Sequence, residues 1–290
     1  MTQGNRSRIQ MSKLILTGLA VLIAVYFVFP VYWLFIASTK SNAQLFQYVG
    51  AWLPPHLELW RNVVEVFQYG GGEYARWLLN SFGYAITGAL FSTIFSALAG
   101  YAFSKYGSGR VMRLLFWVLV GSIFVPITAL ALPIFVIMGK FGLINSPLAV
   151  ILPSMVSPFG LYLMRIYADQ GVPNEVLESA RMDGASEWRV FVQVARHFLT
   201  VPASAVFLFS FVANWNNFFL PLIVLNSSDK FPVNLGLTVW NGLNTEGHAK
   251  LIYNLVLTGA SISIIPLIVG FFVLQRYWRM GAAAGSVTGA

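Results

Sequence analysis

The sequence predicts an all-α integral membrane protein whose chain crosses the bilayer six times. Composition is the first reason, because 57% of the 290 residues are hydrophobic and only 10% are charged. The mean hydropathy of +0.70 also lies far above that of soluble proteins. The second reason is a set of charge-free apolar segments long enough to span a bilayer. Six spans are predicted, at residues 14–37, 77–103, 114–138, 147–164, 199–225 and 253–274.

The first segment, residues 14–37, follows a basic flank and has to be distinguished from a cleavable signal peptide. Its apolar run of 24 residues is longer than the roughly 7 to 15 residues of a signal-peptide core. Phe35 also occupies the −3 position of the candidate cleavage site after Ala37, where a small side chain is required. We therefore expect this segment to remain in the protein as the first span.

The segment between the first two spans contains an amphipathic helical pattern at residues 57–67, followed by three glycines at 70–72. Consecutive glycines end a helix readily, because they adopt conformations that other residues avoid. The pattern predicts a helix on the outer membrane face, with Trp60 and Phe67 toward lipid. Contact with an incoming binding protein is the alternative.

Most of the spans contain proline, which removes a backbone hydrogen-bond donor and bends a helix. Bends near Pro126 and Pro133 could let the membrane domain open and close, and irregular packing is the alternative. The fourth span, with 18 residues, is close to the minimum of about 17. The prolines within spans include Pro30, Pro126, Pro133, Pro153, Pro158, Pro221 and Pro266.

Basic residues in the loops set the expected orientation. If the N-terminus is cytoplasmic, the inner segments carry twelve Lys and Arg residues and the outer segments carry six. This bias predicts that both termini are cytoplasmic, with an N-terminal segment at 1–13, a membrane domain at 14–280 and a tail at 281–290. The net charge of +8 then reflects attraction to an anionic membrane surface. Because the basic residues are scattered, no nucleic-acid partner is expected.

The longest inner loop, residues 165–198, lies between the fourth and fifth spans and is polar at its centre. A first short helix with one apolar face ends at Gly184 if this glycine takes a left-handed conformation. Ser186 can cap a second helix that has an apolar stripe of its own. That stripe consists of Trp188, Phe191, Val192 and Ala195. The loop is therefore interpreted as two amphipathic helices hinged at a glycine, and a plain solvated connector is the alternative.

The centre of this loop resembles the signature of a known family. Its residues Glu178, Ser179 and Ala180, followed by Asp183 and Gly184, are similar to the EAA-and-glycine motif of the permease subunits of binding-protein-dependent ABC importers. Further segments resemble carbohydrate permeases of the maltose MalG type, over roughly residues 14–290. They are Leu79-Asn80-Ser81, Gly142-Leu143-Ile144-Asn145-Ser146, Ser157-Pro158-Phe159-Gly160, Asn214-Trp215-Asn216-Asn217-Phe218, Pro221-Leu222-Ile223 and Leu274-Gln275-Arg276-Tyr277-Trp278.

The resemblance implies a MetI/MalG-like architecture in a bacterial plasma (inner) membrane, with a loop that docks as a coupling helix in a cleft of the ATPase subunit. It implies a second, sequence-distinct permease in a heterodimer, two ATPase subunits and an extracytoplasmic solute-binding protein as partners. The tail at 281–290 would reach the ATPase dimer. The expected coupling residues are Glu178, Ser179, Ala180, Asp183, Gly184 and Ala185.

Two positions depart from the family pattern. Ser179 replaces the first alanine of the motif. Arg196 and His197 stand where the family usually has Leu-Pro before the fifth span. The second departure leaves open how the second helix of the loop enters the membrane.

No ATP-binding site is expected on this chain. No lysine has the glycine spacing of a phosphate-binding loop, so ATP and Mg²⁺ are expected on the partner ATPase subunits and no cofactor on this one. The three histidines are far apart and there is no cysteine, which argues against a metal site and against a membrane glycosyltransferase or hydrolase. All ten acidic residues lie outside the predicted spans, which argues against an ion-coupled secondary transporter.

Polar residues of the fifth span are the candidates for a translocation path. Asn214 and Asn217 share a face with Phe218, and their amides can bond to sugar hydroxyls. Trp215 adds an aromatic surface of the kind that stacks on sugar rings. Interhelical hydrogen bonding is the alternative, and it is the stronger one for Thr87, Ser92 and Ser96. Because no Arg or Lys lies in the predicted spans, a neutral or weakly charged saccharide is expected, and a glycerol-phosphate-type solute is the alternative.

Overall fold

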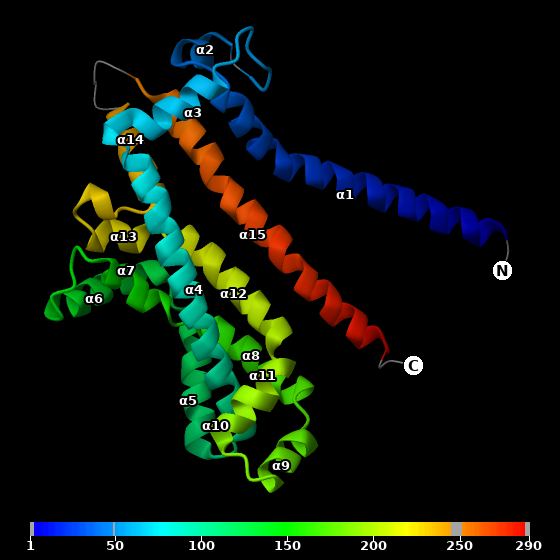
Figure 1. Ribbon diagram of the computed structural model, residues 1–290. Coiled ribbons are helices and arrows are strands. Elements are labelled where there is room, and N and C mark those ends of the chain that lie inside the picture. Colours follow the sequence, from blue (N-terminus) through cyan, green and yellow to red (C-terminus); the bar gives the residue numbers. More distant parts are fainter. Residues whose placement is uncertain (1–2, 49, 245–250, 288–290) are drawn as a thin grey trace. The chain divides into compact units, whose positions relative to one another are not determined.

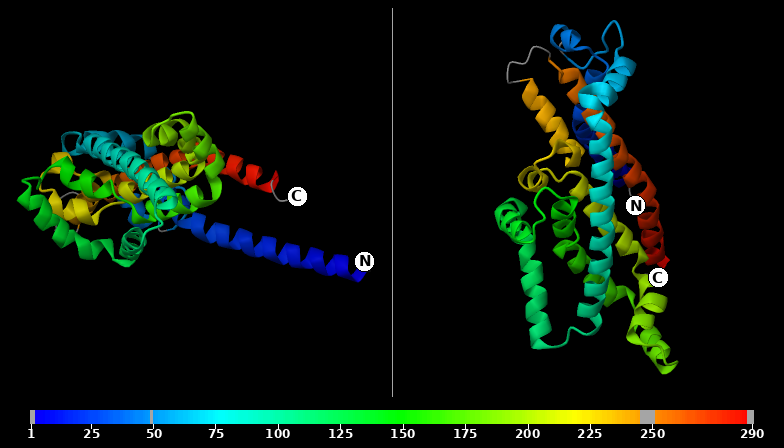
Figure 2. Two further views of the ribbon diagram at one scale, coloured as in Figure 1. Left: turned by 90° about the horizontal axis from the view of Figure 1, so that it is seen from below. Right: turned by 60° about the vertical axis from the view of Figure 1, so that its left-hand side comes forward.

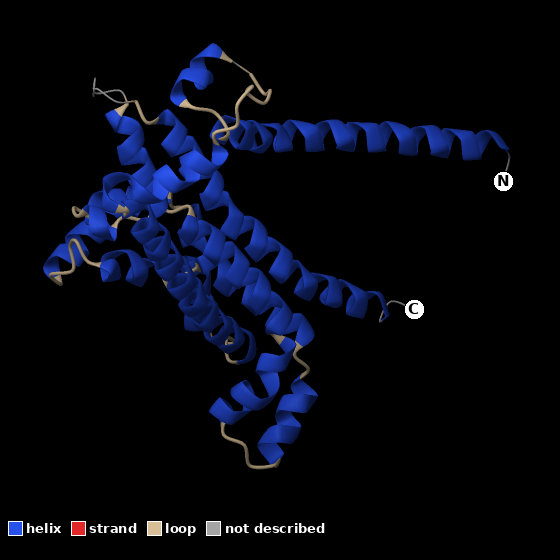
Figure 3. Ribbon diagram, turned by 45° about the horizontal axis from the view of Figure 1, so that its top comes forward, coloured by secondary structure: helices blue, strands red, loops and turns tan. Residues whose placement is uncertain are grey.

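The computed structural model describes residues 3–48, 50–244 and 251–287, and every regular element in these ranges is a helix (Figure 3). The all-α prediction is therefore confirmed. The chain forms two compact units. The first comprises Met1–Gly72 and Leu237–Ile264, and the second comprises Glu73–Gly236 and Ile265–Ala290.

The first unit contains the N-terminal helices and the start of the last one. The helix predicted at 57–67 is confirmed as α3, and the side chain of Trp60 on it is 79% exposed. Gly70, Gly71 and Gly72 all have positive φ angles, so the predicted glycine break follows this helix. The elements of the unit are α1 (Gln3–Ser38), α2 (Asn42–Gln47), α3 (Leu59–Gln68), the 3₁₀-helix η1 (Tyr69–Gly71), the end of α14 (Val233–Leu243) and the start of α15 (Tyr253–Val287).

A buried asparagine joins three segments of the first unit. The Asn62 side chain on α3 donates from Nδ2 to the carbonyls of Ser38 at 2.8 Å and Lys40 at 2.9 Å. Its Oδ1 accepts a hydrogen bond from Asn254 Nδ2 on α15 at 2.8 Å. Buried amide hydrogen bonds are strengthened by their low-dielectric surroundings. The end of α1, the helix α3 and the start of α15 are thereby held together.

The second unit is built around α4 (Glu73–Lys105), which packs most extensively against α8 (Pro158–Gly171) and α12 (Thr200–Trp215) (Figures 1 and 2). Small residues on the buried side of α4 recur three or four positions apart and let the helix backbones approach closely. A Cβ atom added at Gly100 would lie 2.5 Å from Met164 Cβ. These residues are Ser81, Ala85, Gly88, Ala89, Ser92, Ser96 and Gly100.

Hydrogen bonds accompany this close packing. Ser92 Oγ on α4 lies 3.0 Å from Ser210 Oγ on α12. Ser96 Oγ makes a long hydrogen bond of 3.5 Å to the carbonyl of Ser157, just before α8. The interhelical role predicted for Ser92 and Ser96 is confirmed, and that of Thr87 stays a prediction.

The remaining elements of the second unit are shorter and lie around this bundle (Figure 1). The loop between the fourth and fifth predicted spans supplies several of them. They are α5 (Arg110–Gly121), η2 (Ser122–Phe124), α6 (Ile127–Lys140), α7 (Pro147–Ser154), α9 (Asn174–Met182), α10 (Glu187–Arg189), the π-helix η3 (Val190–Ala195), α11 (Arg196–Phe198), α13 (Phe219–Val224) and η4 (Ser228–Lys230), with the start of α14 and the end of α15.

Four helices in the described residues are long and apolar enough to cross a membrane, and the number reaches six if each of two sharply bent helix pairs is one span. The third predicted span, at 114–138, consists of the pair Arg110–Phe124 and Ile127–Lys140, which is bent by 109°, so the bend expected near Pro126 is confirmed. The bend falls at Pro126. Val125 before it has φ −81° and ψ 119°, the extended conformation that a following proline favours.

The helices that correspond to the fourth and fifth predicted spans have different bounds from those predicted. The fourth continues to Gly171, so Arg165 and Asp169 lie on its last turns, with Nε and Oδ2 3.6 Å apart. The acidic residues lie outside the predicted spans, but the longer candidate helices include Glu73 and Asp169 toward their ends, and Glu187 if its bent helix pair is one span. Hydropathy finds the apolar centre of a helix, whereas the helix itself continues into charged ends. The predicted span 199–225 is interrupted at 216–218, between α12 and α13.

Candidate functional site

The turn at Gly184 is the centre of the loop between α8 and α12. Helix α9 ends in a Schellman motif, in which Gly184 N donates to the Arg181 carbonyl at 2.9 Å and Ala185 N donates to the Ala180 carbonyl at 3.1 Å. Gly184 has φ +80°, a left-handed conformation that costs other residues free energy. The predicted left-handed glycine is confirmed. The glycine of the motif therefore fixes the direction in which the chain leaves α9.

The second half of the loop differs from the predicted regular helix. Ser186 has an extended N-cap conformation, but its side chain makes no capping hydrogen bond. Residues Val190–Ala195 form a π-helix, which shifts the register of the side chains. In the predicted apolar stripe, Ala195 is buried, whereas Trp188 is 64% exposed with its ring centroid 6.1 Å from that of Phe191. Val190, which is not part of the stripe, is also buried.

The buried side of the loop packs on the ends of the two long helices. One hydrophobic cluster contains Leu177 from α9 together with Val190, Ala195 and Leu199, which follow the Gly184 turn. This cluster includes Tyr101 near the end of α4, and Ala168 and Val172 at the end of α8. We call these three residues the seat. Because the loop buries its apolar side chains against the seat, it has a defined position on α4 and α8.

Two consecutive residues at the end of α4 anchor the loop through polar contacts. Lys105 Nζ donates to the Val172 carbonyl at 2.7 Å and to Asn174 Oδ1 at 2.9 Å, at the start of α9. The Tyr106 hydroxyl donates to Glu187 Oε2 on α10. Sequence reasoning did not identify either residue as part of the site. No local pattern could have found them, because their partners Asn174 and Glu187 follow 69 and 81 residues later in the chain.

An ion pair spans the Gly184 turn. Arg181 Nε on α9 lies 2.8 Å from Glu187 Oε1 on α10, and Arg181 Nη2 lies 3.3 Å from the Tyr106 hydroxyl. Hydrogen bonds to Glu187 and Tyr106 raise the pKa of Arg181. The hydrogen bonds from Arg181 and Tyr106 lower the pKa of Glu187. Both groups are therefore charged at neutral pH, and they hold α9 and α10 in one arrangement.

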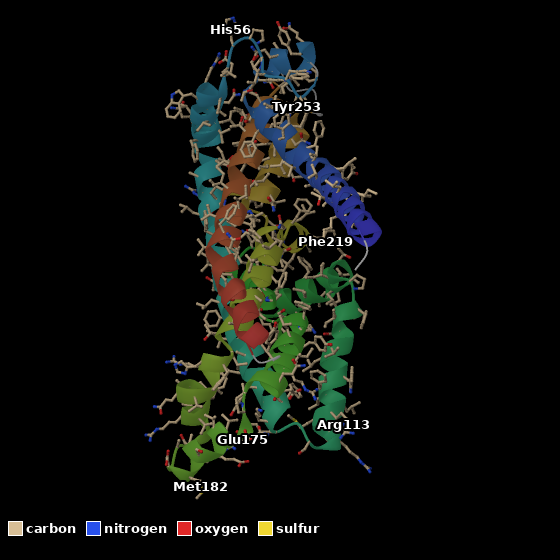
Figure 4. The ribbon with its side chains drawn as sticks, turned by 90° about the vertical axis from the view of Figure 1, so that its right-hand side faces the viewer. His56, Arg113, Glu175, Met182, Phe219 and Tyr253 are labelled. Carbon is tan, nitrogen blue, oxygen red and sulfur yellow. The ribbon has the colours of Figure 1, made fainter. Side chains whose placement is uncertain are left out.

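The predicted coupling residues divide into an exposed tip and a packed base. Glu178, Ser179, Asp183 and Gly184 are exposed, whereas Ala180 and Ala185 are half-buried against the hydrophobic cluster. The tip also carries Met182, which is 88% exposed and projects from the outer end of the loop beyond Glu175 (Figure 4). The tip is therefore the part of the loop that is accessible to a partner.

The serine that departs from the family motif makes a hydrogen bond within its own helix. Ser179 Oγ donates to the Glu175 carbonyl one turn earlier, at 3.0 Å. Its hydroxyl is thereby satisfied within α9, so that it needs no partner from outside.

The candidate path residues lie at the break between α12 and α13. Asn214 is half-buried, and its Nδ2 is buried without a hydrogen-bond partner, next to Gly88 and Ser154. Asn217 follows one turn later, with its N–H donating to the Asn214 carbonyl at 3.2 Å, and Phe218 is half-buried. The structure therefore brings the two asparagines into one turn of chain.

Trp215 has a different environment from the two asparagines. It is 1% exposed, and its ring contacts Phe82 and Phe211, with centroids 4.9 Å and 5.7 Å away. Its carbonyl accepts a hydrogen bond from Asn234 at 3.0 Å. The sequence predicted that the Trp215 ring could stack on a sugar. In the structure this ring packs against other aromatic side chains.

The other motif segments hold the loop that follows α13. Asn145, a non-glycine residue with φ +59°, accepts hydrogen bonds at Oδ1 from the backbone of Asn226 and Ser227, at 3.0 and 3.1 Å. Asn80 Nδ2 donates to the carbonyls of Asp229 and Phe231, at 2.9 and 3.0 Å. Asn80 and Asn145 therefore supply hydrogen-bond partners to backbone groups of this loop. Their role is structural.

With this geometry in place, comparison with known proteins decides the family. Residues 92–279 match the family described as "Binding-protein-dependent transport system inner membrane component". The chain belongs to this family. It is a multi-pass inner membrane permease subunit of an ABC importer, a transport subunit and not an enzyme. Such a permease works with a separate ATPase and with a solute-binding protein.

Relatives of this permease cover nearly the whole chain. The arabinooligosaccharides transport system permease protein AraQ of Halalkalibacterium halodurans is 32% identical over 281 residues, which are 96% of this chain and 97% of that protein. The lactose transport system permease protein LacG of Rhizobium radiobacter is 29% identical over 254 residues, 88% of this chain and 89% of that protein.

A solved structure shares the fold of the permease. The crystal structure of a bacterial ABC transporter involved in the import of the acidic polysaccharide alginate matches with a TM-score of 0.77 and 22% identity, over 96% of this chain and 98% of that chain. The MetI-like permease fold inferred from the loop motif is therefore confirmed.

Proposed function

We propose that this permease forms part of the translocation path of an ATP-driven carbohydrate importer, and that the loop 165–198 transmits the motion of the ATPase to the spanning helices. The observation that carries the coupling role is the combination of an exposed tip with a packed base. Glu178, Ser179, Asp183 and Gly184 are free to meet a partner, while Ala180 and Ala185 face the hydrophobic cluster. The tip can therefore be pushed without the loop separating from α4 and α8.

The route of that motion follows from rigid contacts. A displacement of α9 acts on the seat through Leu177, and on the end of α4 through Lys105 and Tyr106. Helix α4 then carries it along its length, because the close contact of Gly100 with Met164 leaves little room for slippage against α8. ATP and Mg²⁺ would bind to the ATPase subunits, with no cofactor on this chain.

We propose that the break after α12 lies on the path, where the amides of Asn214 and Asn217 meet sugar hydroxyls. The unpartnered Nδ2 of Asn214 supports this, because a buried amide without a partner costs free energy that a passing hydroxyl can recover. Phe218 adds apolar surface beside these amides. The burial of Trp215 supports a role in positioning the break rather than in stacking on the sugar.

A neutral or weakly charged saccharide is the proposed substrate. The names of AraQ and LacG, which refer to arabinooligosaccharides and lactose, support this choice. In the spanning helices Glu73–Lys105 and Pro147–Gly171, the basic residues lie toward the helix ends, at Arg76, Lys105 and Arg165, and Arg165 pairs with Asp169. The middle of these helices offers no counter-charge for a phosphodiester, which disfavours the glycerol-phosphate alternative.

The assembly we propose contains a second, sequence-distinct permease in a heterodimer, two ATPase subunits and the solute-binding protein. Both termini, residues 1–13 and 281–290, would lie in the cytoplasm on the same side as the loop, with the membrane domain at 14–280 between them. The bias of basic residues in the loops supports this orientation.

Substrate-stimulated ATPase activity of the complete importer in proteoliposomes tests the proposed substrate class. The probes are a panel of neutral di- and oligosaccharides, with a glycerol-phosphate diester as the comparison. Neutral saccharides should stimulate ATP hydrolysis and be taken up, while the diester should do neither. Stimulation by the diester alone would overturn the carbohydrate assignment but not the family.

A further inference from the structure

A cavity of about 360 Å³ lies where the loop turns into the fifth span. The helices on either side of it, Glu187–Phe198 and Thr200–Trp215, are bent by 80° relative to each other. The size is within the range of roughly 300 to 1,000 Å³ that small-molecule sites occupy. One part of the lining is apolar and consists of Ala97, Phe191, Leu199 and Ala203, which we call the apolar wall. The other part consists of Arg196, His197 and Thr200.

Arg196 and His197, the basic pair, are the residues that replace the Leu-Pro of the family pattern. Both are exposed, and within the described part of the chain neither side chain has a hydrogen bond or ion pair. The basic residues near them differ in this respect, since Arg181 pairs with Glu187 and Lys105 bonds to Asn174. Arg196 is therefore a positive charge that the fold itself does not neutralise, and His197 adds an imidazole beside it that can donate a hydrogen bond.

The π-helix places this pair at the cavity. It occupies Val190–Ala195, directly before Arg196, and π-helices occur frequently at functional sites because they change which side chains face a given surface. Thr200 Oγ1 donates to the Arg196 carbonyl at 3.2 Å, which holds the turn between α11 and α12. The basic pair thus stands on the last turn before a membrane-spanning helix.

We infer that this cavity binds an anionic phospholipid, with the phosphate at the basic pair and an acyl chain against the apolar wall. A ligand of this site needs both a negative charge and apolar surface, and a phospholipid has both. The end of a spanning helix lies at the depth of the lipid headgroups, where basic pockets between helices bind anionic lipids. A free anion would contact the basic pair but would leave the apolar wall exposed to water. A phospholipid covers both parts of the lining and is therefore the better fit. The small side chains of Ala97 and Ala203 leave the space that a chain needs.

The experiment counts lipids on the complete importer by native mass spectrometry. The complex is placed in nanodiscs of phosphatidylcholine with increasing phosphatidylglycerol, and retained lipids are identified after release. The wild type should retain phosphatidylglycerol in preference to phosphatidylcholine. Arg196→Ala combined with His197→Ala should weaken this retention by about fivefold, the effect expected for removal of the one arginine charge. Arg189→Ala, which removes an exposed arginine of the same loop outside the cavity, should leave it unchanged.

A photo-crosslinking residue introduced at Ala203 gives an independent readout. It should label phosphatidylglycerol in the wild-type complex and lose that label in the double variant. Equal retention of phosphatidylglycerol by the wild type and the double variant would overturn the inference, as would the same loss in Arg189→Ala. Crosslinking to the second permease instead of lipid would show that a protein fills the cavity. Competition by inorganic phosphate at millimolar concentration would show that the site takes a free anion.

Discussion

Arg181 Nε on α9 lies 2.8 Å from Glu187 Oε1 on α10, so that an ion pair closes over the left-handed turn at Gly184. The turn sets the direction of the chain and the ion pair holds the two helices on either side of it. Tyr106, from the end of α4, joins the same pair. The tip of the loop is therefore connected to the longest helix of the second unit by side chains as well as by packing.

The first prediction concerns Gly184. Gly184→Val should leave the permease inserted in the membrane but lower transport per ATP hydrolysed, because a β-branched residue strongly disfavours φ +80°. The cost is about 1 kcal/mol or more at the turn. No atom lies within 4 Å of a Cβ at this position, so the effect would come from the backbone. Paired ATPase and uptake rates of the complete importer measure it.

Two further variants separate backbone strain from side-chain size at this turn. Gly184→Asn should retain coupling, because asparagine tolerates the left-handed region. Gly171→Val should also retain it, because Gly171 at the end of α8 is exposed, with open space and no positive φ. Normal coupling in Gly184→Val would mean that the loop is an ordinary connector.

The second prediction concerns the ion pair. Glu187→Gln should increase hydrogen exchange of the α9 and α10 amides at neutral pH by less than about fivefold, as expected for an exposed ion pair. The pKa of Glu187 is lowered in the folded protein from its ordinary value of 4.5. The contribution of the carboxylate is therefore complete above pH 4.5 and is lost as the pH falls through the lowered pKa.

The pH series supplies the control for this pair. Between pH 6 and 8, hydrogen exchange of the α9 and α10 amides in the wild type should change only as the intrinsic exchange rate does. Its exchange should approach that of Glu187→Gln only at acidic pH. Glu175→Gln, a neutralisation of another exposed carboxylate on α9, should have no comparable effect. Equal exchange in Glu187→Gln and the wild type at pH 7 would show that the pair does not hold the turn.

The third prediction concerns the contact between α4 and α8. Gly100→Ala should lower the thermal stability of the purified permease, because the new Cβ would lie 2.5 Å from Met164 Cβ and 2.7 Å from the backbone nitrogen of Arg165. Backbone cannot move aside as a side chain can, and such overpacking costs about 1 to 3 kcal/mol. Gly83→Ala on the same helix meets no atom within 4 Å. A melting temperature of Gly100→Ala equal to that of Gly83→Ala would contradict the close packing.

The fourth prediction concerns the path. Asn214→Leu combined with Asn217→Leu should reduce sugar uptake several-fold while assembly stays normal. Leucine has a similar volume to asparagine but lacks the amide group that would bond to the sugar hydroxyls. The loss of Asn214 Nδ2 leaves no partner group unsatisfied. Asn216→Leu is the matched control, since Asn216 Nδ2 bonds to the Val212 carbonyl of its own helix at 2.9 Å. Wild-type uptake in the double variant would assign both residues to packing.

Much of this architecture could be predicted locally. The apolar runs identify the helices that can span a membrane, and Gly184 was expected in the left-handed conformation that it takes. The bend at Pro126 was expected, but not its angle of 109°. A proline predicts that a helix is broken, while the direction of the next helix depends on what it packs against.

The sequence by itself determined which segments leave water, where the loop turns and which family the loop motif resembles. Those properties depend on transfer free energy and on backbone preference, which are sums over neighbouring residues. Only the tertiary structure decided that Lys105 and Tyr106 anchor the loop, that Trp215 is buried between Phe82 and Phe211, and that a π-helix turns Arg196 and His197 toward a cavity. Each of these depends on contacts between residues far apart in the chain, and such contacts exist only once α4, α8 and α12 have packed together.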